Sequence, residues 1–256
     1  MNVTRTNEPT GDVPEDADHP EREPSAMRLR ALHPRVPLVF RRLPPAEMVA
    51  RARAYADDMA RRRTVRDFSA EPFPLEILDH AIRAASSAPS GAHQQPWTFV
   101  VVTCPDLKRQ IREAAEVEER KNWEGRMSAE WVAAIEPLGL DWHKRHLTDA
   151  PALVVVFAQP WSAVTTADGA ARRVKHYSVD ESVGIAVGML LSALHLAGLA
   201  TLTHTPSPMA FLNEICRRPA WEKPTILLVA GYPKAGCQVP VHGGLRKPLG
   251  EISSWI

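Results

Sequence analysis

Residues 61–103 organise the rest of the chain and read RRRTVRDFSAEPFPLEILDHAIRAASSAPSGAHQQPWTFVVVT. The stretch opens with four arginines within six positions, which are Arg61, Arg62, Arg63 and Arg66. Each guanidinium offers a planar fork of donors that matches phosphate or carboxylate oxygens. Arginines at the end of a helix also interact favourably with its dipole, so the cluster taken alone indicates a solvated face more often than a ligand clamp.

The remainder of this stretch predicts a helix, a turn of small residues and a buried strand. Apolar residues recur at helical spacing after two prolines, at Leu75, Leu78, Ile82 and Ala85. Residues 88–92, APSGA, let a backbone approach a ligand closely, although Ser-Gly after a helix is also an ordinary stop signal. Residues 97–103 follow as an apolar strand. Together these features suit a flat, phosphorylated ligand, and from the residues alone a cofactor site is the minority hypothesis.

The composition is that of an ordinary globular chain. Its 256 residues can bury a substantial core and predict one folded domain. A net charge of +1 argues against a nucleic-acid partner held through its phosphates. Cys104, Cys216 and Cys237 lie far apart without a CxxC pair, which suits a reducing cytoplasm and offers no zinc site. The polar N-terminus lacks a signal-peptide pattern, so we expect a soluble, cytoplasmic protein.

Residues 183–200, VGIAVGMLLSALHLAGLA, form an uncharged run that is long enough to span a membrane. The run contains Ser192 and His195, lacks a basic flank and passes into the polar strand TLTHT. We therefore interpret it as a core helix that is apolar all round.

The other segments alternate helices with apolar strands, which indicates an α/β or α+β class. Helices are predicted at 44–61, from 105 onward, at 141–147 and at 209–217, and strands at 150–158, 199–203 and 225–230. Residues 159–175 are predicted to be a polar loop. Residues 1–35 are rich in Pro, Glu, Asp, Thr and Asn, and are predicted to be a disordered tail ahead of one domain over 36–256.

Several motifs, in order, resemble one family. RRRTVRDFS followed by APSGAHQQPWTFVVV closely resembles the nitroreductase-like flavoproteins, and specifically the iodotyrosine deiodinase family. APALVVVF, AGLATLTHTP and GYP…RKPL resemble the same family, so that the likeness covers roughly residues 36–249. It implies an α+β nitroreductase-like fold, with a central mixed sheet flanked by helices, in a domain-swapped homodimer. Animal members carry a membrane anchor ahead of the catalytic domain, and we expect the polar tail to stand in its place.

The resemblance implies FMN as the cofactor. The implied binding residues are Arg62, Arg63, Thr64, Arg66 and Arg246 at one end, Ser90 and Gly91 from the other subunit, and Thr203, His204 and Thr205 along the flavin edge. In this branch the last of these donates a hydrogen bond to flavin N5, which is the catalytic role implied for Thr205. Such a donor favours one-electron steps over hydride transfer. Without the motif context, Thr205 would be an ordinary residue at the end of a strand before a proline.

The resemblance also implies that residues 113–147 form a lid over the substrate. Glu119, Trp123 and Lys144 fall where the family has a Glu, a Tyr and a Lys that grip an amino-acid zwitterion. The two charged residues match, whereas Trp123 keeps a donor N–H but loses the acceptor role of the phenol. The backbone N–H of Ala92 is implied to hold the phenolate oxygen. Composition alone would suit a surface helical hairpin with ordinary charges.

The implied activity is FMN-dependent reductive dehalogenation of a halotyrosine or another halophenol, with halide released in two one-electron steps. A general nitro or quinone reductase is the alternative, and a flavin-free anion-binding protein a remote one. The chain has no GxGxxG motif, so we expect a separate reductase as electron donor, or weak direct use of NADPH. His143 and His146 are three apart without an HExxH pattern, which favours exposed histidines over a metal site.

Overall fold

The structure is a computed structural model that describes residues 35–165 and 171–256. It divides into two units, residues 1–48 and residues 49–256. In the first unit, residues 35–44 have no regular secondary structure, and helix α2 (Pro45–Arg61) begins there and ends in the second unit. The predicted tail over 1–35 lies outside the described residues, except for Arg35.

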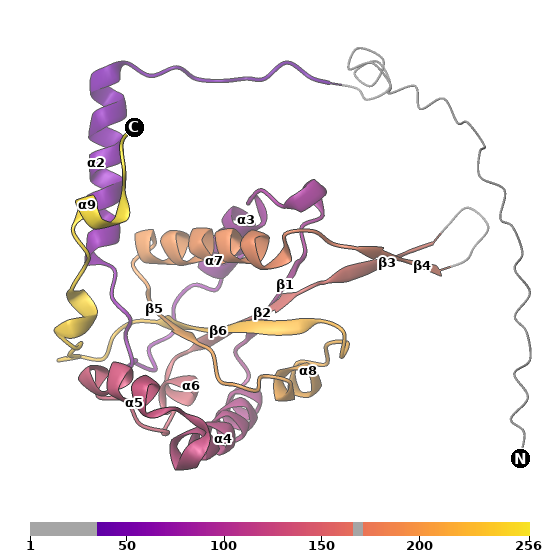
Figure 1. Cartoon of the computed structure of the whole chain (residues 1–256), viewed down its shortest axis with the longest axis vertical. Coiled ribbons are helices and arrows are strands. Elements are labelled where there is room, and N and C mark those ends of the chain that lie inside the picture. The colour runs from indigo at the N-terminus through magenta and orange to yellow at the C-terminus, as the bar shows by residue number, and fades with distance from the viewer. Residues whose placement is uncertain (1–34, 166–170) are drawn as a thin grey trace, which may run out of the picture. The chain divides into compact units, whose positions relative to one another are not determined.

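The second unit is built on a four-stranded sheet in the order β1-β2-β6-β5 (Figure 1). Its strands are β1 (Trp97–Val102), β2 (Ala152–Ala158), β5 (Ala200–His204) and β6 (Lys223–Gly231). Every residue of β2 is buried, as the apolar run ALVVVFA requires of a central strand covered on both faces. The named strands all pair antiparallel, and the parallel contribution is one bridge between Thr64 and Thr201. The predicted α+β class is confirmed.

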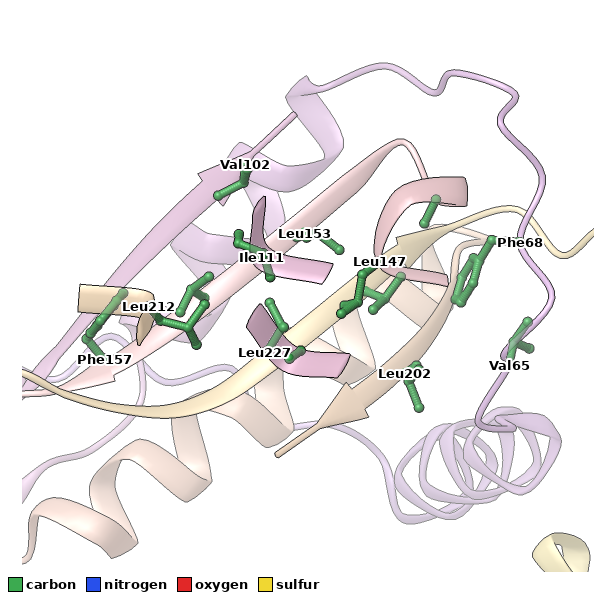
Figure 2. Close-up of a cluster of buried hydrophobic side chains, with 14 residues drawn as sticks. Val65, Phe68, Val102, Ile111, Leu147, Leu153, Phe157, Leu202, Leu212 and Leu227 are labelled. Atoms are coloured by element: carbon green, nitrogen blue, oxygen red, sulfur yellow. The ribbon is translucent and has the colours of Figure 1, made fainter. Parts of the chain in front are cut away.

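Side chains of β2 alternate between two helical layers, because successive residues of a strand point to opposite faces. Leu153, Val155 and Phe157 face the layer of α4 (Pro105–Lys121), α6 (His146–Asp149) and α8 (Phe211–Ile215), which contribute Ile111, Leu147 and Leu212. Figure 2 shows this cluster.

Ala152 and Val154 face the opposite layer, which is formed by α3 (Glu76–Ser86) and α7 (Val179–Leu196) (Figure 1). By length and composition alone, α7 could cross a membrane. Its Leu190 and Leu194 are fully buried against α3 and the sheet, whereas Ile185 and Leu196 are 45% and 55% exposed, so the helix is buried on one face and not all round. The helix begins four residues before the predicted run.

Two predictions were wrong. Residues 159–175 contain the strands β3 (Trp161–Thr165) and β4 (Ala171–Lys175), which pair antiparallel, with residues 166–170 outside the described part. Aromatic and β-branched residues around an Asp-Gly pair favour such a hairpin, but the charged residues of β4 hid the pattern. Residues 141–147 are not one helix, because α6 begins only at His146.

Candidate functional site

The arginine segment lies along the edge strand of the sheet. Val65 N–H donates to the Thr201 carbonyl at 3.2 Å, next to the bridge between Thr64 and Thr201. Val65 itself is buried in the core beside Leu202. Backbone pairing and one buried side chain therefore place the arginines beside the strand that ends at His204.

Three of the cationic residues predicted to bind a cofactor come together at this edge. The pKa of Arg62 is lowered by burial, and further by the charges of Arg246 and Arg63. A Cβ on Gly244 would lie 3.5 Å from Arg63 Nη2, so the chain near Arg246 packs on the same cluster. Arginines held this close together repel one another, and an anion bound between them would offset that repulsion. The guanidinium groups have a geometry that suits phosphate. Arg61 differs, because it pairs with Asp58 on α2.

Residues at the end of the edge strand β5 and directly after it line a cavity of about 1040 Å³. Thr203 and Thr205 are exposed and line it, whereas the ring of His204 between them is buried. The cavity is also lined by Arg66 from the arginine segment and by the lid residues Glu119, Trp123, Arg126, Trp131, Asp141 and Lys144. The structure thus brings three of the predicted substrate residues, Glu119, Trp123 and Lys144, to the same space as Thr203 and Thr205.

Glu119 and Lys144 form an ion pair on the wall of this cavity, and we call these two residues the clamp. Glu119 Oε2 lies 3.2 Å from Lys144 Nζ, and their side chains are only 16% and 9% exposed. Lys144 Nζ also donates to the Asp141 carbonyl at 2.5 Å. A buried anion and a buried cation that face each other can exchange partners with a ligand that carries both charges.

The predicted lid, residues 113–147, departs from the helical geometry that the sequence predicted. Glu119 lies on α4, but the helix ends at Lys121 and Trp123 lies in a short π-helix, η2 (Asn122–Arg126). The lid continues through α5 (Ala129–Ile135) and the 3-10 helix η3 (Glu136–Leu138). Lys144 lies in the irregular segment before α6. Glu119 and Trp123 therefore both reach the cavity, although not as two residues one turn apart on a regular helix.

Two buried histidines lie close together near the clamp. His204 was predicted as a cofactor residue, but the prediction that His146 is exposed was wrong. The rings of His146 and His204 are 6% and 9% exposed, with centroids 5.7 Å apart. Burial lowers the pKa of each to about 3, helped by the positive charges of Lys144 and Arg66. Neither Nε2 has a hydrogen-bond partner among the described residues, and His204 Nε2 lies 3.9 Å from Glu119 Oε1. The two residues are 58 positions apart in the sequence, so their contact is visible only in the structure.

The small-residue turn at 88–95 is held in an unusual backbone conformation. Ala92, His93 and Gln95 all have positive φ, at 50°, 55° and 49°. Gln94 anchors the turn through its side chain, because its Nε2 donates to the Lys175 carbonyl at 2.9 Å and its Oε1 accepts from Tyr177 N at 2.8 Å.

Gly91 sits at the tightest point of this turn. A Cβ there would lie 2.4 Å from the Tyr177 carbonyl oxygen, so the position requires glycine. Gly91 N–H also donates to Ser182 Oγ on the first turn of α7 at 3.3 Å. The turn is therefore fixed by the start of α7 and by the residues that follow β4.

Within one chain, the turn and the arginine segment lie at opposite ends of α7. Ser182 contacts the turn, whereas His195 Nε2 lies 2.9 Å from the Asp58 carbonyl, next to the arginines. These positions are 13 residues apart on one helix, roughly 20 Å at 1.5 Å per residue. Ser90, Gly91 and Ala92 are not among the residues that line the cavity. The structure thus separates them from the other predicted site residues.

Comparison with known proteins identifies the family of this chain. The model of the nitroreductase family matches residues 59–232. The chain is 50% identical over 205 residues to the iodotyrosine deiodinase of Haliscomenobacter hydrossis, which covers 80% of this chain and 90% of the relative. It is 42% identical over 212 residues to iodotyrosine deiodinase 1 of Rattus norvegicus. That alignment covers 82% of this chain and 72% of the relative.

A crystal structure of oxidized iodotyrosine deiodinase bound to FMN and 3-iodo-L-tyrosine is also similar. It aligns with a TM-score of 0.60 at 32% identity, over 70% of this chain and 90% of that chain. The antiparallel sheet, its arginine-lined edge and these matches define the chain as a member of the nitroreductase family. Within that family it belongs with the iodotyrosine deiodinases, as the motifs of residues 61–103 predicted.

Proposed function

We propose that this protein is an FMN-dependent oxidoreductase that removes halide reductively from halogenated tyrosine. The observation that carries the proposal is the buried clamp at the edge of a cavity that Thr203 and Thr205 also line. Membership of the deiodinase branch, with half of the residues identical to a relative over 90% of its length, supports it. The solved relative holds FMN and 3-iodo-L-tyrosine together.

Residues at the sheet edge fit FMN. Arg62, Arg63 and Arg246 form a cationic cluster whose mutual repulsion a phosphate would relieve. Arg66 and Thr64 flank the cluster on the segment that pairs with β5, and Thr203, His204 and Thr205 lie at the far end of that strand. Bound FMN supplies the electrons, and Thr205 would donate the hydrogen bond to its N5. The role of the protein chain is to bind the flavin and the substrate and to orient them.

The clamp suits the amino-acid end of the substrate. An ammonium group would replace Lys144 as the partner of Glu119, and a carboxylate would replace Glu119 as the partner of Lys144. A ligand with both charges leaves neither residue unpaired, whereas a ligand with one charge leaves a buried charge without compensation. Trp123 would contribute its ring and one N–H to the same wall. A nitroarene or a quinone has no need of such a pair, which argues against a general nitro or quinone reductase.

A second copy of the chain would complete the site. The turn at 90–92 lies about one helix length from the arginines of its own chain, so a partner is needed to bring Ser90, Gly91 and the Ala92 N–H to the flavin and the phenolate oxygen. The C-terminal segment exposes large apolar side chains at Leu245, Leu249, Ile252 and Trp255. Exposed apolar segments of this kind are typical of interfaces. We therefore propose a homodimer.

The electron donor and the location complete the proposal. Because the chain has no GxGxxG motif for a dinucleotide, a separate reductase would reduce the bound flavin. Weak direct use of NADPH is the alternative. Three free cysteines suit a cytoplasmic protein.

Anaerobic titration of the FMN-loaded protein with 3-iodotyrosine tests the proposal. We expect flavin fluorescence to be quenched tightly, weak quenching by 2-iodophenol, and release of iodide when the complex is reduced with dithionite. Bound flavin without a response to 3-iodotyrosine would overturn the substrate and leave the fold and cofactor standing.

A further inference from the structure

Two carboxylates of α4 act on one lysine of the lid. Glu116 and Glu119 are three residues apart on this helix, so both point to the same side. Glu119 Oε2 reaches the Lys144 ammonium at 3.2 Å, whereas Glu116 Oε1 accepts the Lys144 backbone N–H at 2.8 Å. One carboxylate thus holds the charge of the lysine and the other holds its main chain.

Glu116 is itself fixed by a network that does not include the cavity. Arg112 Nε donates to Glu116 Oε1 at 2.8 Å, and Arg112 Nη1 donates to Thr148 Oγ1 at 3.0 Å. Thr148 Oγ1 in turn donates to the Arg145 carbonyl at 2.9 Å. The network therefore holds the main chain at Lys144 and in the segment that follows it.

The electrostatics of Glu116 agree with a permanent role. Burial by itself would raise the pKa of Glu116, but the hydrogen bonds from the Lys144 amide and Arg112, with the charge of Arg112, lower it overall. The Arg112 and Glu116 side chains are 27% and 17% exposed. Glu116 is therefore ionised throughout the neutral range, and neither of its partners is a group that a ligand would replace.

Local structure explains why Lys144 needs such an acceptor. The residue precedes α6 and has no regular secondary structure, so its N–H takes a side-chain carboxylate in place of a helical carbonyl. Without that bond, the main chain that carries the ammonium would be free to shift relative to α4. The distance between the two clamp charges would then vary, and a zwitterion has a fixed separation between its own charges.

We propose that Glu116 is a positioning residue for the amino-acid group of the ligand. It fixes the main chain of Lys144 relative to Glu119, so that only the contact between Glu119 and Lys144 opens when a zwitterion binds. The inference rests on the proposed function, because it assumes that the clamp holds the charged end of the substrate. Neither Glu116 nor Arg112 lines the cavity.

The test compares two ligands that share a ring, a phenol and an iodine. For the FMN-loaded protein, Glu116→Gln should raise the Kd of 3-iodotyrosine about tenfold, because the charged acceptor of two donors is lost. The Kd of 2-iodophenol, which has no amino-acid group, should change by less than about twofold. Glu113→Gln makes the same charge change one turn earlier on α4 and should leave both constants unchanged.

A double-mutant cycle separates an effect on the position of Lys144 from a nonspecific loss of structure. In a Lys144→Met background, Glu116→Gln should have no further effect on the preference for 3-iodotyrosine, since the group that it positions is gone. If Glu116→Gln fails to load FMN, Arg112→Lys keeps the charge but loses the fork, and should show the same preference change at about threefold.

The outcomes distinguish failure of the positioning role of Glu116 from failure of the zwitterion clamp. Equal loss of both ligands in Glu116→Gln, or an undiminished effect in the Lys144→Met background, overturns the positioning role. Unchanged binding of 3-iodotyrosine in Glu116→Gln overturns it as well, while the proposed substrate stands. A wild-type protein that shows no preference between the two ligands overturns the zwitterion clamp, and the role of Glu116 with it.

Discussion

The sheet edge and the lid build the two sides of one cavity by different means. Along residues 62–66 the chain is held by backbone pairing with β5 and by the buried side chain of Val65. In the lid, the π-helix and the irregular chain contact α4 through pairs of charged side chains, such as Glu118 with Arg126 and Glu119 with Lys144. Substitutions that remove a charge should therefore leave the conformation of the sheet edge unchanged, whereas in the lid they should alter the conformation.

The largest expected effect is in the clamp. Lys144→Met should weaken 3-iodotyrosine binding about 100-fold, because the ligand carboxylate loses its partner and Glu119 is left buried without one. FMN affinity should stay within about twofold, because the arginines at the sheet edge are untouched. Flavin fluorescence titrations measure both constants. Parallel losses of both ligands would show that the lid and the edge are not independent.

The pair of histidines joins the two regions, since His204 ends β5 and His146 begins α6. Burial lowers their pKa to about 3, so below pH 6.5 the unfolded chain binds protons that the folded chain excludes. Stability should be independent of these groups above pH 6.5 and should fall as pH drops from 6.5 towards 3. Between pH 6.5 and 4.5 each histidine should contribute about 2 kcal/mol to this loss.

Urea unfolding as a function of pH tests that expectation. His204→Asn should flatten the acid side of the stability curve relative to the wild type, because one excluded proton is removed. His80→Asn, at an exposed position on α3, is the matched control for the substitution itself. Identical slopes in all three proteins would mean that the buried ring of His204 does not titrate as described.

Adjacent arginines at the sheet edge should differ in their effect on the cofactor. Arg63→Ala should weaken FMN binding to the apoprotein about tenfold, because Arg63 belongs to the cluster with Arg62 and Arg246. Arg61→Ala should change it by less than about twofold, because that side chain pairs with Asp58. Titration at two salt concentrations measures the difference. Equal losses would place Arg61 in the cofactor site.

The smallest expected effect concerns the turn at 88–95. Gln94→Ala removes the side-chain hydrogen bonds to Lys175, at the end of β4, and to Tyr177. It should weaken 3-iodotyrosine binding about threefold, through looser placement of the Ala92 N–H. The absorbance of the bound phenolate gives a second readout, since a looser donor should raise the pKa of the bound phenol. His80→Asn again serves as the control, and a shift in that variant would contradict the assignment.

Much of the fold could be predicted because its signals are local. The helices α2 and α3 and the strands β1, β2 and β6 lie within a few residues of their predicted positions, since each has a clear helical period or an unbroken apolar run. The hairpin of β3 and β4 was missed because exposed strands carry little apolar pattern. The irregular segment around Lys144 was predicted as a helix because its composition permits one.

Sequence by itself determined the class of fold, the motifs of the family and the chemical types at Arg62, Glu119, Lys144 and Thr205, since these depend on residue identity and order. Tertiary structure alone decided that Glu119 pairs with Lys144, that His146 meets His204, and that Glu116 holds the main chain of Lys144. Tertiary structure also decided that the turn at Gly91 lies far from the arginines of its own chain. The reason is physical: a contact between distant segments is set by how the helical layers pack on the sheet, and no local period in the sequence encodes that packing.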